Sequence, residues 1–258
     1  MNNHYNHIPI KKLRYGYYFK NWFERRKNRA LLERARIDVK FDSGIDPLIS
    51  VIIPTYNRNK LLTERAIPSV LAQSYKNFEL IVIGDRCTDD TDKRIMKIDD
   101  DRLKFVNLPV RGKYPKSSFD RWLVAGSVPR NKGLELASGY WIAPLDDDDE
   151  FTVDHLETLL AFAIQGRFEM VYGQVGMEIA PDKWVNRGSW PLTFENICHQ
   201  GVLYHSRLKF LKYDVNAWKY YEADDWNMWR RMKEAGVKMG FLNKVVAFHH
   251  KEFEQWNV

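Results

Sequence analysis

Short apolar runs alternate with amphipathic segments between residues 48 and 145. Runs of this kind predict buried strands, here at residues 49–53, 78–83, 103–106 and 140–145. Helical spacing of apolar residues predicts helices at 61–73, in a short segment ending near residue 98, and at 129–137. Strands that alternate with helices predict an α/β fold with a mostly parallel, doubly wound sheet.

The second half of the chain has a less regular pattern. Strands are expected at residues 170–175, 177–179 and 245–248, and helices at 152–164 and 224–235. Thr152 is the expected N-cap of the first helix, and Gly236 is suited to end the second. Residues 111–128 are predicted to form a long irregular connection, and loops of that length are typically functional.

The chain divides at a segment rich in turn-forming residues, 42–47. We expect an N-terminal extension, residues 1–46, and a main domain, residues 47–258. A length of 258 residues with 45% apolar residues is enough for one large domain with a substantial core.

The N-terminal extension holds most of the positive charge of the chain. Residues 11–36 contain ten Lys and Arg against two Glu, a net charge of +8, whereas the rest of the chain carries −2. Aromatic residues recur there at helical spacing, namely Tyr15, Tyr18, Phe19, Trp22 and Phe23. This combination suits an anionic membrane surface, where each basic residue contributes about 1 kcal/mol. The alternatives are a helix that packs on the main domain, a subunit interface, and a nucleic-acid arm, the last of which we do not expect.

The cysteine content and the absence of long apolar segments bear on the compartment. Cys87 and Cys198 lie far apart, in neither a metal-binding spacing nor a disulfide framework. No apolar stretch is long enough to span a bilayer, and the N-terminus lacks the apolar segment of a signal peptide. We therefore expect a cytoplasmic protein, held peripherally at the inner face of the membrane if the extension binds lipid.

Four consecutive aspartates, Asp146 to Asp149, follow the apolar run at 140–145. Carboxylates gathered at a strand end repel one another and are often compensated by Mg²⁺ or Mn²⁺, which prefer oxygen ligands. The alternative is a solvated acidic loop. In a doubly wound sheet, ligands bind beyond the carboxyl ends of the strands, where residues 54–58 and 84–86 form two further polar clusters.

Four segments, in this order, resemble the motifs of family 2 glycosyltransferases with the GT-A fold. They are ISVIIPTYNR at 49–58, FELIVIGDRCTDDT at 78–91, VPRNKGLELASGYWIAPLDDDDEF at 128–151 and YYEADDWNMWRRM at 220–232. The resemblance covers about residues 48–250, and its strength lies in the order of the motifs. It implies inverting transfer of a sugar from a nucleotide diphosphate to a hydroxyl of a glycan or lipid-linked acceptor. It also implies a nucleotide-binding half, 47–150, and an acceptor-binding half, 151–258.

The resemblance places donor-binding residues after the first two strands. Pro54 and Tyr56 match positions that contact the nucleoside, with Tyr56 against the base. Asp85 matches the acid that accepts a hydrogen bond from the base, which favours a UDP-sugar, although Gly84 stands where the family often has Asp. Further candidates for donor contacts are Arg58, Arg130, Asp146 and Asp147. Arg130 either reaches a phosphate or forms a surface salt bridge.

The resemblance also implies a metal site and a catalytic base. The metal motif reads Asp146-x-Asp148, with Asp148 as the ligand and Asp147 leaving a second register open. His249 and His250 stand where relatives place a metal-ligating histidine, or they are ordinary strand-end residues.

Two adjacent carboxylates at the start of the last predicted helix are candidates for the base. Asp225 matches the family's base, and Asp224 takes the place usually held by Glu. A general base must lie opposite the leaving diphosphate to take the proton of the attacking hydroxyl. Either carboxylate has a second explanation as a helix cap stabilised by the helix dipole.

Two polar residues and four tryptophans each have two possible roles. His199 and Gln200 either face the donor sugar or acceptor, or form a satisfied core pair. Four tryptophans are candidates for stacking on a sugar, with packing in the core as the alternative: Trp184, Trp190, Trp218 and Trp226. The competing functions are a nucleotidyltransferase acting on a sugar phosphate and a non-catalytic membrane-surface adaptor. No glycine-rich phosphate loop follows the first strand, which disfavours the nucleotidyltransferase and a Rossmann dehydrogenase.

Overall fold

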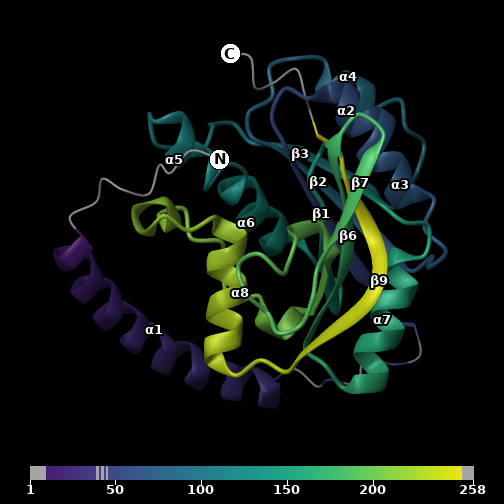
Figure 1. The fold of residues 1–258 in the computed structure, drawn as a ribbon. Coiled ribbons are helices and arrows are strands. Elements are labelled where there is room, and N and C mark those ends of the chain that lie inside the picture. The colour runs from purple at the N-terminus through teal and green to yellow at the C-terminus, as the bar shows by residue number, and fades with distance from the viewer. Residues whose placement is uncertain (1–9, 39–40, 42–43, 45, 252–258) are drawn as a thin grey trace.

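The computed structural model describes residues 10–38, 41, 44 and 46–251, with side chains from residue 21 onward. The side chains of Tyr15, Tyr18 and Phe19, which the sequence placed on the aromatic stripe, lie outside the described residues. Figure 1 shows one sheet with helices on both faces, as expected for a doubly wound fold.

The first half of the sheet is parallel throughout. Its strands are β1 (Ile49–Thr55), β2 (Phe78–Gly84), β3 (Leu103–Asn107) and β4 (Trp141–Pro144), in the spatial order β3-β2-β1-β4. All seven residues of β1 and of β2 are buried, so both faces of these strands carry apolar side chains. The strand order reverses between β1 and β4, which is the point in such a sheet where ligands bind.

The helices of the first half follow their strands as predicted, with one irregularity. They are α2 (Asn59–Leu61), a π-helical turn η1 (Leu62–Ala66), α3 (Ile67–Leu71), α4 (Thr91–Ile95), α5 (Ser118–Trp122) and α6 (Ser127–Leu136). Pro68 has no N–H to donate to the preceding turn, which accounts for a break in the α-helical ladder near residue 67.

The second half continues the same sheet with mixed strand directions. Its elements are β5 (Glu150–Phe151), α7 (His155–Gly166), β6 (Met170–Ala180), β7 (Lys183–Arg187), β8 (Val202–His205), α8 (Asp224–Ala235) and β9 (Met239–His249). Short 3-10 turns are η2 (His199–Gly201), η3 (Ser206–Leu208) and η4 (Ala217–Tyr220). Beyond β4 the order is β8-β6-β9-β5, and only β6 and β9 pair in parallel there.

Three sequence predictions need correction. The segment 111–128 is not wholly irregular, because α5 forms within it and Ser117 caps that helix. The helix predicted from Thr152 begins at His155, because the hydroxyl of Thr152 donates to the carbonyl of Val246 instead of capping it. The two strands expected between 170 and 179 are one strand, β6, which gains its length from pairing with β9.

The core lies on both faces of the sheet. On one face, Val70 of α3 and Leu159 of α7 belong to a buried cluster with residues of β1 and β2, and α7 packs on β6 and β9. On the other face, α6 and α8 pack through Leu134 and Trp229, both fully buried. The strands are therefore held in place by helices on both faces of the sheet.

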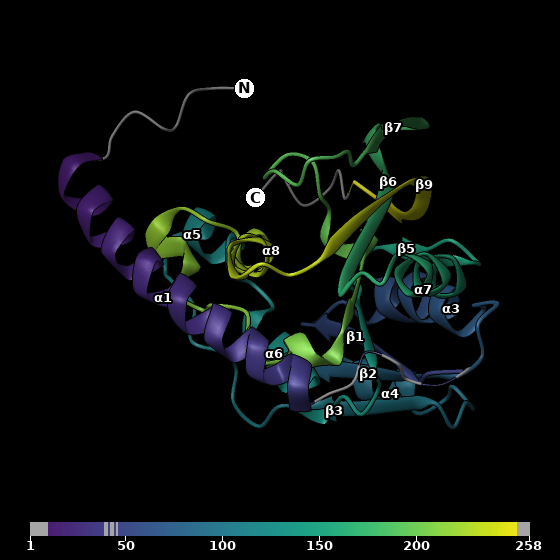
Figure 2. The ribbon, with the colours of Figure 1, turned by 90° about the horizontal axis from the view of Figure 1, so that it is seen from below.

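The N-terminal helix α1 (Ile10–Asp38) lies along α8, on its side away from the sheet (Figures 1 and 2). Leu32 is fully buried in the core, and Arg36 binds the carboxylate of Glu169 with two hydrogen bonds of 2.9 and 2.7 Å. Trp22 and Phe23, in contrast, are 49% and 64% exposed. One face of this helix thus packs on the domain, while the face with Trp22 remains in solvent. No helix in the described part of the chain is long and apolar enough to cross a membrane.

Candidate functional site

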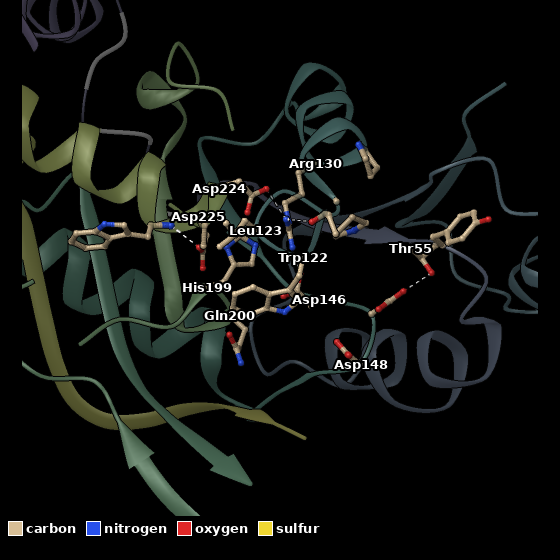
Figure 3. Close-up of a pocket in the computed structure, with 18 of the residues that line it drawn as sticks. Thr55, Trp122, Leu123, Arg130, Asp146, Asp148, His199, Gln200, Asp224 and Asp225 are labelled. Carbon is tan, nitrogen blue, oxygen red and sulfur yellow. Dashed lines mark hydrogen bonds and ion pairs between the residues drawn. The ribbon is translucent and has the colours of Figure 1, made fainter. Parts of the chain in front are cut away.

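A cavity of about 560 Å³ opens where the carboxyl ends of β1 and β4 face the start of α8. Nearly all residues singled out from the sequence line it. They are Pro54, Tyr56, Arg58, Asp85, Arg130, Asp146, Asp147, Asp148, His199, Gln200, Asp224, Asp225, Trp226 and His249. Figure 3 shows Arg130, Asp146 and Asp148 from the first half of the chain facing His199, Asp224 and Asp225 from the second half.

One end of the cavity is built by Tyr56 and Asp85, after β1 and β2. Asp85 is buried, and its two carboxylate oxygens accept hydrogen bonds of 2.8 Å from the backbone N–H of Gly112 and the hydroxyl of Tyr114. The guanidinium of Arg111 lies 3.5 Å from the centroid of the Tyr56 ring. The sequence reasoning did not identify Arg111, Gly112 or Tyr114, because they lie in a segment without periodicity and meet Asp85 only in the folded chain.

The acidic run after β4 is compensated by basic residues of the chain. Asp147 accepts hydrogen bonds from Thr55 Oγ1 at 2.7 Å and from Arg58 Nη1 at 3.2 Å, and the same Arg58 nitrogen lies 2.5 Å from Asp148 Oδ2. Burial, followed by the charge of Asp148, raises the pKa of Asp147 to about 7. Asp147 is held by β1 and Arg58 and is buried, whereas Asp148 is more open to the cavity.

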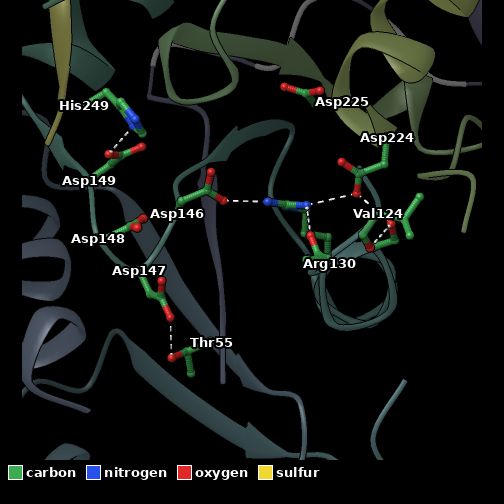
Figure 4. Close-up of polar contacts among 12 residues, drawn as sticks. Thr55, Val124, Arg130, Asp146, Asp147, Asp148, Asp149, Asp224, Asp225 and His249 are labelled. Carbon is green, nitrogen blue, oxygen red and sulfur yellow. Dashed lines mark hydrogen bonds and ion pairs between the residues drawn. The ribbon is translucent and has the colours of Figure 1, made fainter. Parts of the chain in front are cut away.

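Arg130 joins the acidic run to the start of α8 (Figure 4). Its Nη2 lies 2.6 Å from Asp146 Oδ1, and its Nη1 lies 2.9 Å from Asp224 Oδ2 and from the carbonyl of Ala125. Burial opposes ionisation of Asp146, but the charge of Arg130 holds the pKa of that carboxyl well below its usual range. A surface salt bridge is therefore the wrong description of Arg130, which is 9% exposed and shared by two carboxylates.

The two histidines at the end of β9 have different surroundings. His249 lines the cavity, and its Nδ1 lies 2.8 Å from Oδ1 of the buried Asp149. Burial lowers the pKa of His249, but the hydrogen bond to Asp149 and the charges of Asp149, Asp148 and Asp146 raise it to about 9. His250 instead lies 3.3 Å from Glu150 and meets the ring of Trp184 edge-on, outside the cavity lining.

The carboxylates offer oxygen donors to a divalent cation, but not a complete shell. Within the described residues, no group of three His, Cys, Asp or Glu side chains is arranged to hold a metal ion alone. Oδ2 of Asp149 is buried and has no hydrogen-bond partner there. Carboxylate oxygens of this kind fit Mg²⁺ or Mn²⁺, which complete their shell with water and substrate phosphates.

Asp224 and Asp225 are adjacent but are held differently. Asp224 is buried, and its Oδ2 accepts hydrogen bonds from Ser127 Oγ at 2.6 Å and from Arg130. Asp225 faces the cavity, and the one hydrogen bond to its carboxylate in the described structure comes from the N–H of Trp226, at 2.6 Å. Burial and then the charge of Asp224 raise the pKa of Asp225 to about 6. A carboxylate with a raised pKa and an open side is suited to take up a proton.

His199, from η2, also lines the cavity, and Figure 3 shows its ring between Asp225 and Asp146. Its side chain is 5% exposed, and neither ring nitrogen has a hydrogen-bond partner among the described residues. Burial lowers the pKa of His199 to about 3, so the imidazole is neutral. The pair with Gln200 is therefore no satisfied core pair: both residues line the cavity.

The aromatic residues divide between the cavity and its surroundings. Trp226 lines the cavity, but Trp184, Trp190 and Trp218 do not. Two exposed rings that the sequence reasoning missed, Trp122 and Phe194, do line it. Phe194 meets Trp226 edge-on at 5.8 Å. The sequence did not indicate a role for Trp122, because this residue lies in the segment that was predicted to be irregular.

Comparison with known proteins identifies the family. The model described as glycosyl transferase family 2 matches residues 50–116 and 124–233. The chain is 37% identical over 134 residues to the GalNAc(5)-diNAcBac-PP-undecaprenol beta-1,3-glucosyltransferase of Campylobacter jejuni, covering 51% of this chain and 39% of that protein. It is 33% identical over 147 residues to the UDP-Glc:alpha-D-GlcNAc-diphosphoundecaprenol beta-1,3-glucosyltransferase WfgD of Escherichia coli, covering 54% and 53%. The chain thus matches about half or less of the length of these relatives.

Solved structures share the fold. The S. aureus TarS fragment 1-349 in complex with UDP-GlcNAc superposes with a TM-score of 0.63 at 21% identity, covering 79% of this chain and 58% of that one. The mannosyltransferase PcManGT from Pyrobaculum calidifontis, in complex with GDP-Man and Mn²⁺, gives a TM-score of 0.57 at 15% identity, covering 92% and 68%. At sequence identities this low, the similarity shows a shared fold and nothing more. It confirms the expected GT-A architecture.

Proposed function

The chain belongs to glycosyl transferase family 2, and from this premise we propose that it is an inverting glycosyltransferase. It moves a sugar from a nucleotide diphosphate to a hydroxyl of a glycan or lipid-linked acceptor. The observation that carries the proposal is the cavity itself. It is lined on one side by an open carboxylate, Asp225, and on the other by Asp146 to Asp148, whose charges Arg58 and Arg130 compensate. Family membership leaves the nucleotidyltransferase alternative without support.

The donor in this proposal is a UDP-sugar. Pro54, Tyr56 and Asp85 form the nucleoside end of the cavity. A buried carboxylate there suits the ring N–H of uracil, because each Asp85 oxygen keeps a second lone pair beyond its bond to Gly112 or Tyr114. The complex of TarS with UDP-GlcNAc and the UDP-Glc in the name of WfgD are consistent with this nucleotide.

A divalent cation, Mn²⁺ or Mg²⁺, would be held by Asp148 and Asp146 together with the donor phosphates, and by His249 once the cation displaces its proton. When bound, it neutralises the charge that develops on the leaving diphosphate. His250 is the weaker candidate, because it faces Glu150. Arg58 adds a positive charge beside Asp148, at the same end of the cavity.

Asp225 is the proposed base. The acceptor oxygen attacks from the side opposite the diphosphate, and Asp225 takes its proton. Asp224 is unsuited to this task, because Ser127 and Arg130 already donate to its carboxylate. We assign Asp224 to positioning: through Arg130 it connects the start of α8 to Asp146.

The acceptor in this proposal is lipid-linked and reaches the enzyme at a membrane surface. The names of the two relatives specify undecaprenol-linked diphosphate sugars. The exposed face of α1 carries Trp22 and Phe23, and Arg26 lies 4.7 Å from the Trp22 ring centroid. Aromatic rings among basic residues suit the headgroup region of an anionic bilayer.

The test is a panel of nucleotide sugars, assayed for slow donor hydrolysis and for transfer to undecaprenyl-diphosphate sugars. We expect UDP-sugars to be hydrolysed with Mn²⁺ present and not with EDTA. Asp225→Asn is the matched variant that keeps the donor site and lacks the base. If no nucleotide sugar binds or reacts with wild-type protein in the presence of Mn²⁺ or Mg²⁺, the proposed function is wrong.

A further inference from the structure

We propose that His199 binds a hydroxyl of the donor's sugar and thereby helps determine which sugar is transferred. The inference rests on the proposed function, since it requires a nucleotide sugar in the cavity. It begins from a property of the imidazole that the folded chain leaves unexplained.

Both ring nitrogens of His199 are buried without a hydrogen-bond partner in the described part of the chain. A buried polar group left unsatisfied costs about 1–3 kcal/mol, so two on one ring call for an explanation. The other buried histidines differ: His155 Nδ1 lies 2.9 Å from the carbonyl of Val246, and His205 Nδ1 accepts from the N–H of Arg207. Of these three buried rings, only His199 lines the cavity.

The ring is held in place by packing. It is tilted against Trp229 with the ring centroids 5.9 Å apart, and it meets Tyr213 edge-on at 5.7 Å. The turn η2 packs closely on β6: a Cβ atom at Gly201 would lie only 2.9 Å from the Val175 side chain. Packing of this kind holds each ring nitrogen in a fixed direction, which is what selective binding requires.

The place of the ring matches that of a transferred sugar. The sugar must lie between the diphosphate, near Asp146 and Asp148, and the attacking oxygen, near Asp225. Figure 3 shows the His199 ring between the carboxylates of Asp225 and Asp146. A sugar in this position would therefore lie beside the His199 ring.

The chemistry of a neutral imidazole suits a hydroxyl. One ring nitrogen donates and the other accepts, and a sugar hydroxyl can bind either of them, because it both accepts and donates. Burial lowers the pKa of His199 by more than the charge of Asp146 raises it, and Arg130 lowers it further, so the ring is neutral and keeps its acceptor. A site that hydrogen-bonds a hydroxyl discriminates strongly against a sugar that lacks it, because its own polar atoms are then left unpaired.

The experiment compares His199→Phe with wild type, using UDP, UDP-glucose and UDP-GlcNAc as titrants with Mn²⁺. Phenylalanine keeps the packing on Trp229 and Tyr213 and removes both nitrogens. We expect UDP affinity to change less than twofold and the affinity of the better UDP-sugar to fall by about 10-fold. His205→Phe is the control for loss of a buried imidazole elsewhere, and His199→Asn, which retains a donor and an acceptor, should recover part of the loss.

A deoxy series locates the hydroxyl. With UDP-2-, 3-, 4- and 6-deoxyglucose, one analogue should bind wild type weakly and be insensitive to His199→Phe, because the contact is already missing. Equal loss for UDP and UDP-sugars, or no loss for either, would overturn the inference while wild-type hydrolysis still supports the proposed function. If wild type itself binds no nucleotide sugar, both fail.

Discussion

Replacing Asp225 with Asn should remove activity and at the same time stabilise the protein. The variant keeps the size of the side chain and an oxygen that can accept from the Trp226 N–H. Without the base, turnover should fall by about 10²–10⁴-fold, and donor binding should be retained. This combination distinguishes a base from a structural cap, whose loss would lower stability.

The gain in stability follows from the raised pKa. Asp225 has a pKa of about 6 in the folded protein, against about 4 in an unfolded chain. Between these values the folded state binds more protons than the unfolded state, so stability falls as pH rises through this window. Two pKa units correspond to about 3 kcal/mol of free energy of unfolding. Because Asp225 is partly exposed and the helix dipole favours its charge, we expect a gain of about 1–2 kcal/mol above pH 7.

The assay is urea unfolding of wild type and Asp225→Asn at pH 8 and pH 4. The variant should be more stable at pH 8, and the difference should shrink at pH 4, where the wild-type carboxyl is neutral. Asp224→Asn is the comparison. Burial raises the pKa of Asp224 too, but Asp224 is the partner of the buried Arg130, and the substitution leaves that charge with one carboxylate and weakens the contact to Ser127. We therefore expect Asp224→Asn to destabilise the protein by about 1–3 kcal/mol. An Asp225→Asn protein that is less stable at pH 8, or that transfers sugar normally, would refute the reasoning.

Further outcomes follow from the same site and from α1. In wild type, kcat/KM should rise with pH through about 6 and level off above it, as Asp225 loses its proton; a flat profile from pH 5 to 8 would argue against this base. Asp148→Ala should abolish the tightening of UDP binding by Mn²⁺ with the fold intact, as titration calorimetry can check. The double variant Trp22→Ser, Phe23→Ser should bind phosphatidylglycerol vesicles more weakly at low salt, as cosedimentation can measure. Ile37 is also exposed but lies near the other end of α1, so Ile37→Ser is the control and should not weaken binding.

The elements that the sequence predicted well are those whose environment is uniform. β1 and β2 are buried on both faces, so unbroken apolar runs marked them without knowledge of their neighbours. Ligands bind beyond the carboxyl ends of parallel strands, which predicts that Tyr56, Asp85 and Asp146 lie together. All three line the cavity. Helix α8 was predicted from its acidic start to Gly236, which ends it in the left-handed conformation.

Other features depended on contacts between residues far apart in the chain. The sequence could not separate Asp224 from Asp225, since the difference lies in Ser127 and Arg130, which approach Asp224 from another helix. It likewise could not show that one face of α1 packs on the domain while Trp22 stays exposed. Periodicity reports whether a side chain is buried, because burial repeats with the geometry of its own helix or strand. It carries no information on which partner covers that side chain, and the protonation and chemical role of Asp225 and His199 depend on those partners.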